Sequence, residues 1–184
     1  PMPLKAGEKT GQFGLWLTEY IHEERSEKDY LVYYDHGDPT LHDNVKVIKG
    51  FIGEKVKNAN RLTDIDVLVA NQDKEILLLI EIEESPISPK TLLGDIFASL
   101  VSTKFSVWED SHLEFPVTNR SRLIIVGFHP NRKRQKNYHD DIRRRIGEFS
   151  VPEDSIRESN IELIIESDLN TSLEKLRQRM KKIL

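Results

Sequence analysis

The chain has 184 residues, contains no cysteine and carries 31 acidic against 27 basic side chains, which gives a net charge of −4. This length favours a single domain over residues 1–184, and the lack of cysteine excludes disulfide scaffolds, zinc–thiolate sites and cysteine catalysis. A net acidic chain argues against indiscriminate binding to nucleic acid, and no apolar run reaches the ~18 residues that would span a membrane. The first residues show no secretory-signal pattern, so we expect a cytoplasmic protein without a membrane partner.

Hydrophobic periodicity and turn residues predict an alternation of helices and strands. In chain order, the expected elements are a helix at 12–25, strands at 30–34, 45–52, 64–70 and 76–84, a helix at 89–105, a strand at 123–128, a helix at 137–149, a strand at 161–165 and a helix at 172–183. The strands at 64–70 and 76–84 are the clearest, because each contains a continuous apolar run and the polar residues between them have hairpin length. Helices before and after the strands predict an α/β fold with three layers.

Acidic side chains gather on these two strands. Residues 61–84 contain seven acids and two bases. If the two strands form a hairpin centred on the short turn between them, Asp66 lies directly opposite Glu81. The same register pairs Asp64 with Glu83, and since alternate residues of a strand share a face, all four carboxylates would lie on one face of the sheet.

Such a cluster is costly, because two unit charges ~4 Å apart repel by ~4 kcal/mol at an effective dielectric of ~20. A fold tolerates it if the carboxylates take up protons, meet bases, stay solvated or bind a cation. Carboxylate oxygens favour hard cations such as Mg²⁺, for which Mn²⁺ is expected to substitute. The sequence therefore predicts a magnesium site at this hairpin, and a solvated hairpin end is the alternative.

The segments D-I-D-V-L-V at 64–69 and L-L-L-I-E-I-E at 77–83 resemble the core of the PD-(D/E)XK nuclease superfamily. That family places an Asp at the start of one strand and an acid-x-Lys at the end of the next. In the resemblance, Asp66 takes the place of the metal-binding Asp and Glu81 that of the acid. The resemblance covers residues 11–128 and implies a three-layer restriction-endonuclease-like core, with a mixed central sheet flanked by helices.

One position departs from the family pattern, since Glu83 stands where the family usually has its lysine. Some restriction endonucleases of the superfamily carry Glu at this place, so the resemblance still implies activity. Lys90, in the first turn of the next helix, could supply an ammonium group from a shifted position, or be an ordinary solvated lysine. The family's first helix often adds a glutamate that faces the site, and Glu24, on the apolar stripe, is the candidate ahead of Glu19.

The resemblance implies metal-assisted hydrolysis of phosphodiester bonds, in which bound Mg²⁺ activates a water and stabilises charge on the phosphate. Its expected catalytic residues are Asp66, Glu81, Glu83 and Lys90. The expected metal ligands are Asp66, Glu81, Glu83, Asp64 and Glu24. Within this set, Glu83 or Lys90 would orient or deprotonate the water.

A basic segment follows later in the chain, where residues 132–145 contain seven bases against two acids. Phosphate neutralisation requires Lys and Arg at such density, although a solvated helix face would look the same. The side chains expected to contact DNA are Arg132, Lys133, Arg134, Lys136, Arg143 and Arg144.

We therefore expect a Mg²⁺-dependent DNA endonuclease of restriction or repair type that works as a homodimer. Two other functions stay open: a non-catalytic nucleic-acid-binding or protein-binding module that retains the fold, and an accessory subunit of a separate cutting chain. An alternative cation site is the loop that holds His36 and His42 beside Asp35, Asp38 and Asp43.

Overall fold

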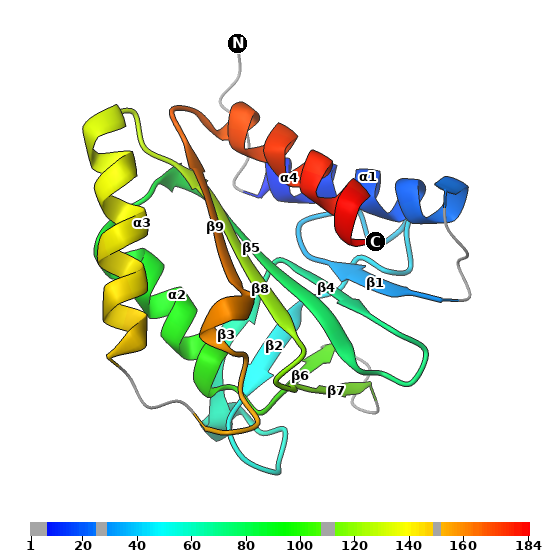
Figure 1. The fold of residues 1–184 in the computed structure, drawn as a ribbon. Helices are drawn as coiled ribbons and strands as arrows, with labels where there is room; N and C mark the ends of the chain where they lie inside the picture. Colours follow the sequence, from blue (N-terminus) through cyan, green and yellow to red (C-terminus); the bar gives the residue numbers. More distant parts are fainter. Residues whose placement is uncertain (1–6, 25–28, 108–112, 149–151) are drawn as a thin grey trace.

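The structure, a computed structural model, describes residues 7–24, 29–107, 113–148 and 152–184. In chain order its elements are α1 (Glu8–Glu24), β1 (Leu31–Tyr34), β2 (Ile48–Phe51), η1 (Asn58–Asn60), β3 (Arg61–Ile65), β4 (Val67–Ala70), β5 (Ile76–Pro86), α2 (Pro89–Val101), β6 (Lys104–Val107), β7 (Glu114–Pro116), β8 (Arg122–Phe128), α3 (Arg132–Gly147), η2 (Glu158–Asn160), β9 (Ile161–Glu166) and α4 (Leu169–Ile183) (Figure 1). No helix in these ranges is both long and apolar enough to cross a membrane.

Five strands form a mixed central sheet in the order β1-β4-β5-β8-β9. Strand β4 is antiparallel to both of its neighbours, β1 and β5, whereas β5, β8 and β9 run parallel to one another. Helices α1 and α4 bury Leu17 and Leu176 in the core on one face of this sheet. Helices α2 and α3 bury Ile96 and Ile142 on the other face (Figure 1). The predicted α/β class is therefore confirmed.

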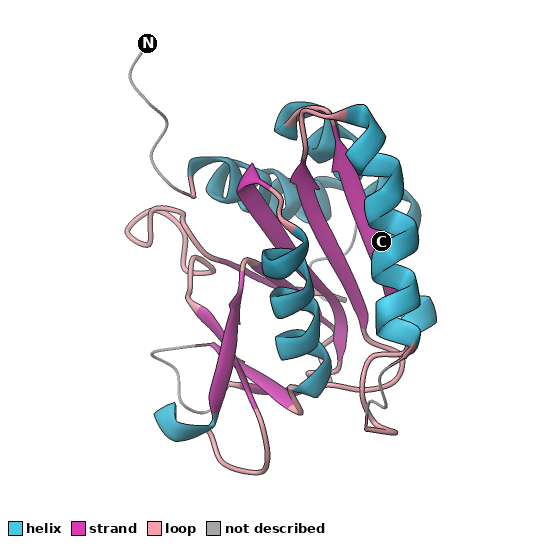
Figure 2. Cartoon of the chain, turned by 90° about the vertical axis from the view of Figure 1, so that its left-hand side faces the viewer, coloured by secondary structure: helices cyan, strands magenta, loops and turns pink. Residues whose placement is uncertain are grey.

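A second, antiparallel sheet has the order β3-β2-β6-β7 and lies below the central sheet in Figure 2. The single strand predicted at 64–70 is therefore wrong, since the chain bends at Asp66 and its two halves belong to different sheets. Strands β6 and β7 were not predicted, because they are short and α2 ends at Val101 rather than at residue 105.

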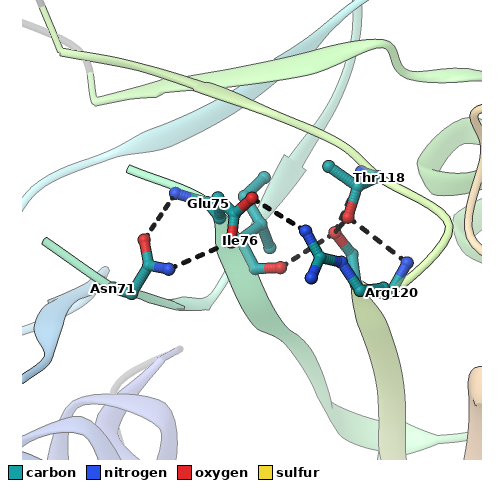
Figure 3. A network of polar contacts seen from close by, with 6 residues as sticks. Asn71, Glu75, Ile76, Thr118 and Arg120 are labelled. Atoms are coloured by element: carbon teal, nitrogen blue, oxygen red, sulfur yellow. Dashed lines mark hydrogen bonds and ion pairs between the residues drawn. The ribbon is translucent and has the colours of Figure 1, made fainter. Parts of the chain in front are cut away.

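The register predicted for the hairpin is confirmed where β4 meets β5. Val67 lies opposite Ile80, and Val69 opposite Leu78, although a bulge shifts the pairing next to the turn. Beyond the bulge, a polar network fixes the turn (Figure 3). Asn71 accepts from the Glu75 backbone and donates to the Glu75 carboxylate, at 2.8 and 3.1 Å.

This network continues onto β8, the next strand of the sheet (Figure 3). The Arg120 guanidinium donates to Glu75 at 3.0 Å, and the buried Ser121 hydroxyl donates to the carbonyl of Ile76 at 2.9 Å. Because a slip of one residue would turn every side chain of β5 to the other face, these bonds also determine which face its acids occupy.

Three helices begin at the same edge of the central sheet. Each of α2, α3 and α4 directly follows one of the parallel strands β5, β8 and β9, so that their N-termini gather at the carboxyl ends of those strands. Ser88 caps α2 by accepting from the Thr91 backbone at 3.1 Å, and Asp168 caps α4 by accepting from Thr171 at 3.0 Å. Such an edge is where α/β sheets commonly place ligands.

Candidate functional site

Asp66 lies at the bend where the chain leaves the second sheet and enters the central one. Its backbone carbonyl accepts from the Asp35 N–H at 2.9 Å, which ties the bend to the end of β1. Its side-chain Oδ2 accepts from the Ile82 N–H at 2.6 Å, which directs the carboxylate toward β5. Asp66 therefore lies between β3 and β4, and its backbone and its side chain are both held by hydrogen bonds.

Glu81 lies on β5 beside Asp66, because one further step of the observed register pairs these two residues. It shares a face with Leu79, whose side chain belongs to the core beneath α2 and α3. The Glu81 oxygen Oε2 is buried and has no hydrogen-bond partner among the residues that the structure describes. A buried polar atom without a partner costs free energy, so this oxygen is a natural position for a ligand.

Two further carboxylates, those of Glu83 and Asp95, lie near Glu81. Glu83 follows on the same face of β5 and accepts hydrogen bonds from the backbone and the hydroxyl of Ser85. Asp95 comes from α2, where it lies between the buried residues Leu92 and Ser99 along the helix. Asp95 was not a sequence candidate, since nothing in an isolated helix shows which of its turns faces the acidic strand.

Burial and repulsion from neighbouring carboxylates raise the pKa values of the Asp66 and Glu81 carboxyl groups. Desolvation raises the pKa of Asp66 to about 7; the Ile82 N–H and His36 counteract this, and Asp35 and Glu84 add to it. The pKa of Glu81 lies well above its usual range because of desolvation, with repulsion from Asp66, Asp95 and Glu83.

Desolvation and repulsion from Glu83 also raise the pKa of Asp95, to about 6. We call Asp66, Glu81, Glu83 and Asp95 the carboxylate cluster.

The carboxylate cluster has the chemistry of a hard-cation site. No three His, Cys, Asp or Glu side chains within the described ranges are already arranged as a complete metal site. The donors nevertheless fit Mg²⁺, because they are all oxygens and because the unpartnered Glu81 oxygen lacks a counter-charge. A divalent ion would favour the ionised carboxylates that burial disfavours. Asp66, Glu81 and Glu83 are the residues that would hold it.

Two of the predicted metal ligands lie elsewhere. Asp64 is opposite Lys49 of β2 rather than Glu83, and it forms an ion pair with Arg61, whose Nε donates at 2.9 Å. Glu24 is exposed at the C-terminal end of α1, whereas the other end of that helix meets β5 through Thr10. Fourteen residues of helix separate Glu24 from Thr10, about 21 Å. The predicted pairing of Asp64 with Glu83 is therefore wrong, because the chain bends at Asp66, and Glu24 lies at the end of α1 far from Thr10.

Lys90 is exposed in the first turn of α2, just after the Ser88 cap. It lies nine residues after Glu81 in the sequence, and its pairing with the cluster stays a prediction.

The predicted DNA-binding residues lie on α3, which follows β8 and is anchored by a hydrogen bond from the Tyr138 hydroxyl to the Ile87 carbonyl at 3.4 Å. Arg144 is exposed and forms ion pairs with Asp141 and Glu148 of the same helix. The other candidate side chains lie outside the described part of the structure: Arg132, Lys133, Arg134, Lys136 and Arg143.

Comparison of the chain with protein-family models, with curated proteins and with solved structures finds no match. The geometry and chemistry of its own residues therefore carry the functional proposal.

Proposed function

We propose that this protein is a Mg²⁺-dependent DNA endonuclease with a restriction-endonuclease-like core, and that it works in the cytoplasm. The observation that carries the proposal is the desolvated pair of Asp66 and Glu81, in which the Glu81 oxygen Oε2 is buried without a hydrogen-bond partner among the residues that the structure describes. Without a bound cation, this pair has no evident structural purpose, since like charges that face each other destabilise a sheet.

The order of elements supports the nuclease-like core. Asp66 immediately precedes β4, and Glu81 and Glu83 lie in the second half of β5, which continues into α2. The resemblance to the PD-(D/E)XK superfamily implies an acid at the start of one strand, an acid-x-Lys on the next and then a helix, and this chain follows that order with Glu83 in place of the lysine.

The surroundings of the carboxylate cluster suit a phosphodiester substrate. The N-termini of α2, α3 and α4 gather at the carboxyl ends of β5, β8 and β9, further along β5 than Glu81 and Glu83. A helix N-terminus attracts anions through its free N–H groups and its dipole. In the sequence, residues 132–136 at the start of α3 include four Lys and Arg residues. A phosphate at the carboxylate cluster would thus meet positive potential on one side and the cation site on the other.

The residues of the carboxylate cluster would have different roles in the reaction. Asp66, held by the Ile82 N–H, and Glu81 with Glu83 would bind the cation. When bound, Mg²⁺ would lower the pKa of a water and offset charge on the phosphate, and Mn²⁺ would substitute for it. Glu83, oriented by Ser85, would accept a hydrogen bond from the attacking water. Asp95 would complete the negative surroundings that attract the ion.

Cutting both strands of a duplex with one site per chain requires two copies, so the proposal includes a homodimer. Sedimentation of the protein with and without a DNA duplex checks this part separately.

Incubation of supercoiled plasmid with Mg²⁺ or Mn²⁺ tests the activity. Wild type should nick and linearise the plasmid, whereas Asp66→Asn and Glu81→Gln should lose activity by at least ~100-fold, because both remove a charge from the cation site without changing shape. Asp64→Asn is the matched control, since that carboxylate lies two residues away and pairs with Arg61; it should cut like wild type. Binding of DNA without cutting under any divalent ion would favour the non-catalytic module instead.

A further inference from the structure

His36 has a backbone conformation that few residues other than glycine adopt. Its φ is +64°, and within the described ranges only one other non-glycine residue, Lys74 in the β4–β5 turn, has a positive φ. Such conformations cost free energy and cluster at functional sites. Lys74 is explained by its tight hairpin turn, whereas His36 lies in the longer loop after β1.

Helix α1 is shaped to hold His36 in this position. A Cβ atom on Gly11 would lie 2.2 Å from the His36 carbonyl oxygen, and one on Gly7 would lie 2.2 Å from Cγ of the imidazole. Any side chain at these two positions would displace the loop. Gly7, just before α1, and Gly11, in its first turns, therefore allow the backbone to pack directly against His36.

On its other side, His36 is connected to the carboxylate cluster. Its backbone N–H donates to the Asp35 carboxylate at 2.6 Å, and the Asp35 N–H donates to the carbonyl of Asp66 at 2.9 Å. The Asp35 carboxylate also lies 3.9 Å from Nε2 of the imidazole. The imidazole thus lies beside the Asp35 carboxylate, and the His36 side chain stays 45% exposed and open to a substrate.

On its face of β5, Glu81 is followed by Glu83 and not by the lysine that the superfamily usually has there, so β5 supplies no basic side chain at that position. We propose that His36 fills this role: its imidazole, held by Asp35 and gripped by α1, donates a hydrogen bond to a non-bridging oxygen of the scissile phosphate. This inference rests on the proposed nuclease function. It names a catalytic residue that lies outside the two strands carrying the acids.

Steady-state cleavage of plasmid DNA with Mg²⁺ tests the inference. His36→Asn keeps a residue that tolerates positive φ but removes the imidazole, so kcat should fall by ~100-fold, as when one donor to a developing oxyanion is lost. Thermal stability and Mg²⁺ affinity should stay at wild-type values. His42→Asn is the matched control in the same loop and should leave kcat unchanged.

Chemical rescue separates catalysis from structure. His36→Gly relieves the backbone conformation and leaves space for the ring, so free imidazole added to this variant should restore part of the lost kcat. Retention of kcat within about threefold of wild type in His36→Asn would overturn the inference and leave the nuclease proposal intact. The inference would also be overturned if His36→Asn lowered the Mg²⁺ affinity or the thermal stability and left kcat unchanged. Failure of imidazole to restore any kcat in His36→Gly would overturn it as well. If wild type itself fails to cleave, both proposals fall.

Discussion

At the scale of single residues, the decisive feature is the desolvated carboxylate of Asp66 beside Glu81. Their pairing could be predicted from the sequence, because the short turn and the alternation of strand side chains define a register. Asp95 and His36 could not, since one depends on how α2 packs and the other on a loop that α1 folds into position. Local periodicity carries no information on either contact.

The raised pKa values predict how stability depends on pH when no divalent ion is present. The folded protein binds protons on Asp66 and Glu81 more tightly than the unfolded chain, so their contribution is fully present below about pH 4. It is lost as the pH rises through about 7, the pKa of folded Asp66.

Urea unfolding in a metal chelator at pH 5 and pH 8 checks this. Raising the pH should increase the free energy of unfolding of Asp66→Asn relative to wild type by more than about 1 kcal/mol, because the neutral amide cannot ionise. Asp64→Asn, at an exposed ion pair, should show no such trend. A difference between Asp66→Asn and wild type that does not vary with pH would mean that Asp66 is not desolvated.

At the scale of elements, the close approach of α1 to the loop after β1 positions the site. This helix has glycines where its neighbours need space, whereas Gly94 of α2 has nothing within 4 Å of the Cβ position. The sequence contained Gly7, Gly11 and Gly94 without distinguishing these roles. It also hid the division into β3 and β4, because the alternation of polar and apolar residues continues through Asp66 although the backbone bends there.

These two glycine environments predict opposite effects of the same substitution. Gly11→Ala should destabilise the protein by about 1–3 kcal/mol, because the methyl group would meet the His36 carbonyl. Gly94→Ala should stabilise it by about 0.5–1 kcal/mol, since alanine is the better helix former and the space is open. Thermal unfolding of both variants measures the pair. Equal effects would contradict the packing described for α1.

At the scale of the whole molecule, the net charge of −4 conceals a separation of charge. Acids concentrate in residues 61–84, which include β3, the bend at Asp66 and β5, whereas bases concentrate in residues 132–145. The net negative charge therefore opposes indiscriminate binding to DNA. It is compatible with DNA binding in which a metal ion held by the carboxylates contacts a phosphate. The α/β class could be predicted from the order of elements, whereas the second sheet depended on long-range strand pairings.

This separation predicts that divalent ions strengthen DNA binding. Ca²⁺, which seldom supports phosphodiester cleavage, should increase the affinity for a DNA duplex by at least ~10-fold, because the ion bridges the carboxylates and a phosphate. Glu81→Gln should lose most of this gain. Fluorescence anisotropy of a labelled duplex at constant ionic strength measures both, and an equal gain in the variant would place the ion elsewhere.

The central claim is that the pair of Asp66 and Glu81 holds a divalent cation. Calorimetric titration of the DNA-free protein with Mn²⁺ at about pH 8 tests it most directly, because this pH lies above the pKa of Asp66 and metal binding requires deprotonated ligands. Wild type and Asp64→Asn should bind the ion with the same stoichiometry and affinity, whereas Glu81→Gln should bind it at least ~10-fold more weakly. Undiminished binding by Glu81→Gln, or no binding by wild type, would contradict the account.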